Sequence, residues 1–266
     1  MSGPRVLTLE ERKRLKRMRI KKHNLANMLL HWFNVAGWAF LLPTGLAILV
    51  STHFRVTTLH WNDALRSLFG GLSNLLYFHE VAGLIWLFVL TFNVVVGFRK
   101  YFIPFSTERM MLDRDDIEWF KLKPLQMLGF EVTLPLQGAY NAGQKAYSFV
   151  VFAGIFVIGV TGLIMTFPQY VPARWIVQWA LPLHFLAVGT VVAGLVIHVY
   201  MGAIFPEEKP AFFSMFTGYV DGLYAYSHHY KFFKRRVEEM RRWEQEERRK
   251  IMEELVRRRQ RYQEKP

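Results

Sequence analysis

The chain has 266 residues, of which 52% are apolar, and it carries a formal net charge of +13 and no cysteine. Such a high net charge together with such a high apolar fraction indicates that the charged residues are segregated from long apolar runs, as in an integral membrane protein. The lack of cysteine excludes disulfides, thiolate iron–sulfur and zinc sites and covalent c-type haem attachment, so any redox metal would have to be held by histidine.

The first 24 residues are basic and lack the short apolar stretch and small-residue cleavage site of a signal peptide. We therefore expect the first apolar segment to remain in the mature protein. Four segments after residue 24 are long and apolar enough to cross a hydrocarbon core, which takes about 20 helical residues. We expect these spans at residues 28–50, 75–98, 146–167 and 179–205.

The sequence therefore predicts an all-α fold with three parts. Residues 1–24 form a basic N-terminal segment, residues 25–205 form an integral membrane four-helix bundle, and residues 206–266 form a charged C-terminal tail. Within this tail, residues 231–266 are rich in Lys, Arg and Glu, often three or four positions apart, which predicts a solvated helix. Because acidic residues are interleaved with basic ones, we expect this helix to lie near anionic lipid or a partner subunit rather than on nucleic acid.

Lysine and arginine are distributed unevenly about the four spans. The segment before the first span carries 9, the 99–145 loop carries 7 and the segment after the fourth span carries 15, whereas the two other loops together carry 3. Short flanking segments rich in these residues stay in the cytoplasm. Both termini are therefore predicted to be cytoplasmic.

Four histidines lie inside the predicted spans, where an ionisable side chain is costly and indicates function. In the predicted topology, His31 and His198 lie near the cytoplasmic face, and His79 and His184 lie near the outer face. The 14 positions from His184 to His198 correspond to a rise of about 21 Å along the helix. The rotation between them is about 40° short of four full turns, so both imidazoles project from nearly the same face of the helix. Imidazoles paired in this way predict two haem b groups, each held between two histidines.

Each histidine also has a simpler interpretation, because a histidine near a helix end can reach the interface or bond a backbone carbonyl. The pairing of all four by depth and by helix face favours ligands. Small residues near the histidines could let a porphyrin lie close to the backbone: Gly37, Gly83, Gly189 and Gly194. We expect the five histidines of the loops and tails to be solvated: His23, His53, His60, His228 and His229.

The segment Tyr140-Asn141-Ala142-Gly143-Gln144-Lys145, just before the third span, resembles a motif of the b-type cytochrome (gamma) subunit of respiratory formate dehydrogenases. The likeness covers roughly residues 25–235. It includes the surroundings of all four histidines: His31-Trp32, Phe78-His79 with Gly83, Leu183-His184, and Ile197-His198-Val199-Tyr200-Met201.

This resemblance implies ligands and a substrate site. It implies that His31 and His198 are the axial ligands of a cytoplasmic-side haem b, and that His79 and His184 ligate an outer one. It also implies a menaquinone or ubiquinone site formed by Asn141, Gly143, Gln144 and His198. An Asn, a Gln and an exposed backbone amide at a helix start can donate to two quinone carbonyls. Without the resemblance, the same stretch fits a simple helix N-terminal cap.

The resemblance further implies an electron-transfer role in a prokaryotic inner membrane. The chain would anchor a formate dehydrogenase whose molybdenum or tungsten catalytic (alpha) subunit oxidises formate. An iron–sulfur (beta) subunit would pass the electrons to the chain, which would carry them through two haems to quinone. The sequence departs from the family pattern at Met28, where an Arg is common, and in a longer tail beyond about residue 235.

Two alternatives remain open. The same kind of cytochrome can anchor a hydrogenase, a thiosulfate reductase or another molybdoenzyme. A haem-free four-helix transporter or assembly factor would also have four apolar spans.

Overall fold

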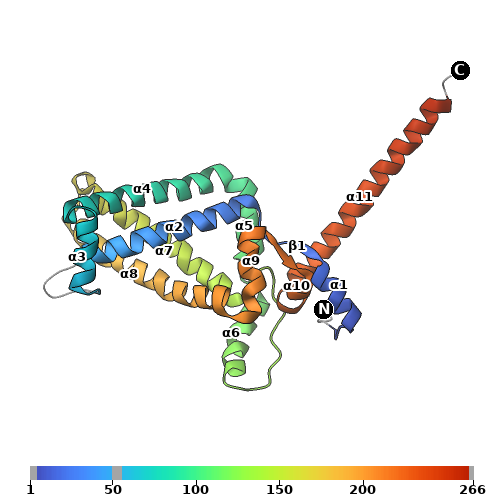
Figure 1. Cartoon of the computed structure of the whole chain (residues 1–266), viewed down its shortest axis with the longest axis horizontal. Helices are drawn as coiled ribbons and strands as arrows, with labels where there is room; N and C mark the ends of the chain where they lie inside the picture. Colours follow the sequence, from blue (N-terminus) through green and yellow to red (C-terminus); the bar gives the residue numbers. More distant parts are fainter. Residues whose placement is uncertain (1–4, 50–55, 264–266) are drawn as a thin grey trace. The chain divides into compact units, whose positions relative to one another are not determined.

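The computed structural model describes residues 5–49 and 56–263, and helices dominate it (Figure 1). The chain divides into two compact units. The first, here called the bundle unit, comprises residues 23–111 and 143–218. The second, here called the tail unit, comprises residues 1–22, 112–142 and 219–266.

Within the described residues, four helices are long and apolar enough to cross a membrane, which confirms the predicted all-α membrane bundle. They are α2 (Leu25–Ile48), α4 (Leu72–Gly97), α7 (Ala142–Thr166) and α8 (Arg174–Val199). All four begin several residues earlier than hydropathy predicted, because the polar first turns belong to the helix although they are not apolar. At the start of α2, for example, the Asn24 side chain accepts a hydrogen bond from the Asn27 amide at 2.8 Å.

Two of the long helices continue through π-helical turns. After α4, a π-helical turn η1 (Phe98–Phe102) leads into α5 (Ile103–Arg109), so the chain is helical from Leu72 to Arg109. A second π-helical turn, η3 (Tyr200–Ile204), extends α8. A π turn widens a helix without ending it. The charges at Arg99 and Lys100 therefore mark where the apolar stretch ends, and the helix goes on.

The connections define two ends of the bundle unit, as Figure 1 shows. At one end, α3 (Leu59–Leu68) lies between α2 and α4, and the 3₁₀ turn η2 (Pro168–Tyr170) connects α7 to α8. At the other end, η3 is followed by η4 (Pro206–Glu208) and α9 (Lys209–Thr217). We call these the α3 end and the α9 end. The chain order places the starts of α4 and α8 at the α3 end and the starts of α2 and α7 at the α9 end.

Indole N–H groups connect helices of the bundle unit. Trp32 on α2 donates to the Met215 carbonyl on α9 at 2.9 Å. Trp86 on α4 donates to the Asn34 side chain on α2 at 3.1 Å. Such buried donors need acceptors, so these bonds fix which faces of the helices meet.

The tail unit contains α1 (Leu9–Arg17), α6 (Arg114–Met127), α10 (Gly222–His228), α11 (Tyr230–Gln263) and a short antiparallel ribbon. In the ribbon, β1 (Arg19–Lys21) pairs with β2 (Tyr219–Asp221), and the buried Ile20 lies opposite the buried Val220. This pairing was not predicted, because three-residue strands are too short to show an alternating pattern.

The long helix α11 fulfils the prediction of a solvated helical tail. Its side chains beyond Trp243 are mostly exposed. Ion pairs between residues three or four apart follow its surface, including Arg258 with Glu254 at 2.7 Å.

Candidate functional site

His79 and His184 lie at the α3 end of the bundle unit, and each imidazole is held by a threonine from another helix. The Nδ1 atom of His79 on α4 lies 2.8 Å from the hydroxyl oxygen of Thr44 on α2. The Nδ1 atom of His184 on α8 lies 2.9 Å from the hydroxyl oxygen of Thr161 on α7. The two imidazoles are also close enough to interact electrostatically. The structure thus brings together the two histidines that depth pairs near the outer face.

The two threonines are buried and bonded to their own helices. Thr44 is 2% exposed and lies 2.8 Å from the carbonyl oxygen of Phe40, one turn earlier on α2. Thr161 is 4% exposed and lies 2.6 Å from the carbonyl oxygen of Val157 on α7. Neither threonine was among the residues predicted to belong to the site. The sequence contained one signal that could have pointed to them: the two spans without His79 or His184 each contain a Thr-Gly dipeptide.

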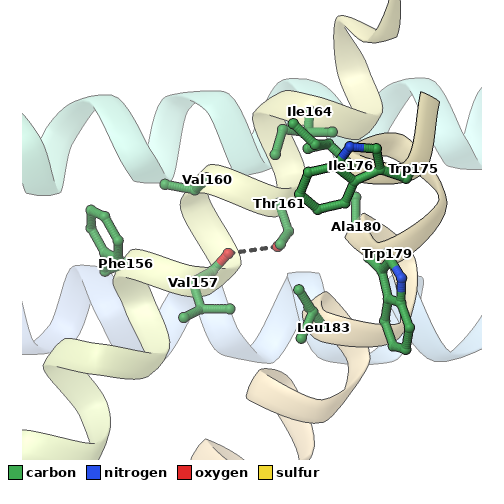
Figure 2. A pocket seen from close by; sticks show the side chains of 10 residues that line it. All are labelled: Phe156, Val157, Val160, Thr161, Ile164, Trp175, Ile176, Trp179, Ala180 and Leu183. Carbon is green, nitrogen blue, oxygen red and sulfur yellow. Dashed lines mark hydrogen bonds between the residues drawn. The ribbon is translucent and has the colours of Figure 1, made fainter. Parts of the chain in front are cut away.

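An apolar cavity of about 240 Å³ lies between α7 and α8 beside Thr161 (Figure 2). Figure 2 shows the Trp175 and Trp179 rings on the α8 side and Phe156 on the α7 side, with the Thr161 hydroxyl bonded to the Val157 carbonyl. Aliphatic and aromatic side chains form the rest of the lining. The region next to the His184–Thr161 pair is therefore hydrophobic and suited to an apolar ligand.

His31 and His198 lie at the opposite, α9 end. His31 is in the second turn of α2 and His198 is next to last in α8. The two side chains are close enough to interact electrostatically. The Nδ1 atom of His31 is buried and has no hydrogen-bond partner among the residues that the structure describes. The structure therefore also brings this second pair together, without a threonine on the His31 ring.

Tyr147 on α7 is a further residue of the α9 end. Its ring stacks on that of His198, with centroids 5.7 Å apart and planes inclined by 30°. Its hydroxyl donates to the Val191 carbonyl at 3.3 Å. Tyr147 lies three residues after Gln144, which puts both on neighbouring turns of one helix face. This spacing was the signal in the sequence that could have pointed to Tyr147.

The predicted quinone residues surround the start of α7. Asn141 directly precedes the helix, and Gly143 and Gln144 are in its first turn. The backbone N–H of Ala142 donates to the Gln137 side chain at 2.8 Å, so a residue before the motif satisfies this first amide of the helix.

Two histidines expected to be solvated are buried, so that prediction was wrong for them. His229 in the tail unit is 2% exposed: its Nδ1 atom lies 2.8 Å from the Gly138 carbonyl and its Nε2 atom lies 3.3 Å from the Tyr224 hydroxyl. His23 in the bundle unit is 5% exposed, and its Nδ1 atom lies 3.4 Å from an Arg109 guanidinium nitrogen. Both histidines lie in polar segments of the sequence, and their burial depends on tertiary contacts that a local pattern does not predict.

The remaining predictions for loop histidines have different outcomes. His60 and His228 are exposed, as predicted. His53 lies outside the described residues.

The four glycines expected to give space to a porphyrin fall into two groups. A Cβ atom on Gly37 would lie 2.7 Å from the Trp86 ring, and one on Gly194 would lie 2.3 Å from the Tyr147 ring. Aromatic side chains of neighbouring helices therefore fill those two spaces. At Gly83 the nearest described atom would be 4.0 Å away, and at Gly189 no described atom comes within 4 Å. Among these four described glycines, open space therefore remains at Gly189, and a Cβ atom on Gly83 would make an ordinary van der Waals contact with Leu41.

Comparison with known proteins identifies related sequences. A family model described as prokaryotic cytochrome b561 matches residues 22–218. The cytochrome b556(Fdn) subunit of the nitrate-inducible formate dehydrogenase of Escherichia coli (strain K12) is 30% identical over 201 residues, which cover 74% of this chain and 85% of the relative. The cytochrome b556(fdo) subunit of formate dehydrogenase from the same strain is 26% identical over 144 residues, covering 53% of this chain and 66% of the relative. With four apolar helices and two histidine pairs within the matched region, the chain belongs to the prokaryotic cytochrome b561 family.

Proposed function

We propose that this chain is the membrane-anchor cytochrome b subunit of a formate dehydrogenase complex, and that it carries electrons from a partner subunit to a quinone. The assignment to a formate dehydrogenase is supported by the likeness to the cytochrome b556(Fdn) subunit over 85% of that protein's length. Membership of a cytochrome b family disfavours the alternative of a haem-free transporter or assembly factor.

Family membership implies haem b, and the histidines of the bundle unit fit this group. Neutral imidazole is a haem ligand, and two imidazoles from different helices come close together at each end. At the α3 end the Nδ1 atoms face threonine hydroxyls, which leaves the Nε2 atoms for iron. We therefore propose that His79 and His184 hold one haem b and that His31 and His198 hold a second. When bound, haem b supplies a one-electron carrier in the membrane.

The residues around these pairs have separate tasks in this proposal. The aliphatic and aromatic side chains beside Thr161 exclude water from the α3 end and offer an apolar surface to a ligand. At the α9 end, the Tyr147 ring limits the positions that the His198 ring can take.

We assign the quinone site to the start of α7 together with His198. The side-chain amides of Asn141 and Gln144 and the backbone N–H of Gly143 can donate hydrogen bonds to quinone carbonyls. Stacking of Tyr147 on His198 supports this assignment, because it brings the helix that carries Gln144 against the helix that carries His198. A quinone bound there would lie next to the His31–His198 pair.

The uneven distribution of Lys and Arg supports an orientation with both termini in the cytoplasm. His31 and His198 would then lie toward the cytoplasm, and quinone reduction there would take protons from that side. The relatives are named as subunits of formate dehydrogenases, which supports a complex with other subunits. The partners in this proposal are an iron–sulfur (beta) subunit and a molybdenum or tungsten catalytic (alpha) subunit.

The pairing of four intramembrane histidines is the single observation that carries the proposal, and purification of the full chain with its partners tests it. We expect a reduced-minus-oxidised spectrum with b-type bands, two haems b per chain and a co-purifying formate-oxidising subunit. The absence of b-type bands would overturn the proposal. Co-purification with a hydrogenase or another reductase would overturn the formate dehydrogenase assignment.

A further inference from the structure

Two Thr-Gly dipeptides take part in the same contact on different helices. Beside Thr44, a Cβ atom on Gly45 would lie 3.1 Å from the Cε1 atom of His79. Beside Thr161, a Cβ atom on Gly162 would lie 3.7 Å from the Cε1 atom of His184. In both cases the threonine hydroxyl meets Nδ1 of the imidazole and the adjacent glycine lies against Cε1. We call each dipeptide an imidazole cradle.

The number of protons in each cradle determines which tautomer the imidazole adopts. A threonine hydroxyl has one proton to donate and two lone pairs to accept with. Each hydroxyl already lies within 2.8 Å of the carbonyl four residues earlier in its helix, and a carbonyl can only accept. The proton therefore goes to the carbonyl, and the hydroxyl accepts from Nδ1–H of the histidine. The tautomer that results has an unprotonated Nε2 atom, which is the form that ligates iron.

Burial makes these bonds hard to replace. Thr44 and Thr161 are almost completely buried, so the hydroxyl groups that face the imidazole nitrogens are shielded from water. A buried N–H group that loses its acceptor is destabilised. A histidine that donates its second N–H to an acceptor is also a more basic ligand, and this favours the oxidised metal.

We propose that Thr44 and Thr161 are positioning residues for the haem at the α3 end, which fix the tautomer and rotation of its two ligands and lower its midpoint potential. The proposal rests on the ligation by His79 and His184 proposed above. It is specific to this end of the bundle, because the Nδ1 atom of His31 has no such partner among the described residues.

Thr44→Val is the main test, because it removes the hydroxyl and keeps a similar shape. Thr161→Val is the second variant, since the Thr161 hydroxyl makes the corresponding contact with His184 on the other helix pair. Thr44→Ser and Thr161→Ser keep the hydroxyl and serve as rescues. Thr190→Val is the matched control, because the exposed Thr190 on α8 makes the same bond to the carbonyl four residues earlier, at 2.8 Å.

The measurements are haem content, redox titration and low-temperature electron paramagnetic resonance of the purified complex. In Thr44→Val we expect the α3-end haem to titrate at a higher midpoint potential with altered ferric g-values, or to bind about 10–100-fold more weakly. The α9-end haem should be unchanged, and the Ser variants and Thr190→Val should match wild type. Val variants that keep two haems with wild-type potentials and g-values would overturn the proposal. A wild-type complex without b-type haem would instead overturn the proposed function.

The glycines give an independent pair of variants. In Gly45→Ala the new methyl group would press on the His79 ring at 3.1 Å, whereas in Gly162→Ala it would make an ordinary contact at 3.7 Å. We therefore expect Gly45→Ala to shift the spectrum of the α3-end haem and Gly162→Ala to leave it unchanged. If Gly45→Ala also left the spectrum unchanged, Gly45 would have no part in the cradle.

Discussion

Tyr147 on α7 stacks on His198 on α8, and the same tyrosine ring covers Gly194, one turn before that histidine. A methyl group on Gly194 would meet the ring, so the glycine lets the tyrosine approach the backbone of α8. We expect Tyr147→Leu to remove a stacking contact of roughly 0.5–1.5 kcal/mol and to change the ferric spectrum of the α9-end haem. Tyr147→Phe keeps the ring and should behave like wild type in spectroscopy of the purified complex. A wild-type spectrum in Tyr147→Leu would show that stacking does not position His198.

Replacing single histidines should separate the two haems. We expect His79→Ala to remove the α3-end haem and to preserve the other, because its ring meets residues of the α3 end. His198→Ala should remove the α9-end haem and also abolish quinone reduction. Haem stoichiometry and redox titration measure both effects. Equal loss of both haems in each variant, in a protein that still folds by circular dichroism, would contradict the assignment.

The start of α7 offers a test of the quinone site. We expect Gln144→Ala to weaken binding of a quinone-analogue inhibitor about tenfold, as the loss of one hydrogen bond of roughly 1.4 kcal/mol would. Its haem content should stay at the wild-type value. Gln137→Ala is the control, because it removes the acceptor of the Ala142 N–H and should destabilise the helix start by about 1 kcal/mol. Unchanged inhibition in Gln144→Ala would favour a purely structural role for the motif.

His229 should be important for the stability of the tail unit. In His229→Leu the Gly138 carbonyl would lose its 2.8 Å hydrogen-bond donor in a buried place, which costs about 1–3 kcal/mol. Amide hydrogen exchange of the tail unit in the full chain would report the loss. The neighbouring exposed His228 is the control, and His228→Leu should change exchange much less. Equal protection in both variants would contradict the role given to His229.

Lys231 on α11 links that helix to the start of α6 through Asp113 at 2.9 Å and Asp115 at 2.5 Å. Partial burial acts to lower the pKa of Lys231, but hydrogen bonds and charge attraction from the two aspartates outweigh it and raise that pKa above 10.5. Since the pKa is raised on folding, the contribution to stability is fully present below about pH 10.5 and is lost as the pH rises through the folded value.

We therefore expect Lys231→Met to lower the stability of the tail unit at pH 7 by at most about 1 kcal/mol, as for other partly exposed ion pairs. The difference from wild type should shrink above pH 10.5. Thermal unfolding of both proteins across this range measures it. A difference that stays constant to high pH would mean that the effect is due to packing of the lysine chain.

The spans and the histidines were predictable because each has a strong local signal. A run of apolar residues reveals a membrane helix, and an ionisable side chain such as His79 is conspicuous inside it. The helix ends were less predictable. The turn η1 and the helix α5 prolong α4 through residues after 98 that hydropathy assigns to a loop, whereas η3 lies inside the predicted fourth span. Hydropathy measures the apolar stretch and does not measure where backbone hydrogen bonding stops.

Residues that act through contacts with distant segments were missed. Thr44 and Tyr147 are ordinary residues of a membrane helix until the fold places an imidazole beside each one. His23 and His229 lie in polar segments, and their burial depends on segments far away in sequence, such as Gly138 for His229. The β1–β2 pairing joins residues about 200 positions apart, and no local pattern specifies it.

That ribbon has a consequence for biogenesis. The strand β1 is synthesised before the first membrane helix, whereas its partner β2 emerges only after the fourth. The hydrogen bonds of Arg19–Lys21 must therefore wait until the ribosome has synthesised all four membrane helices and the strand β2 that follows them. Completion of the ribbon thus comes late in translation, so a chain that stalls before residue 219 leaves the N-terminal strand without its partner.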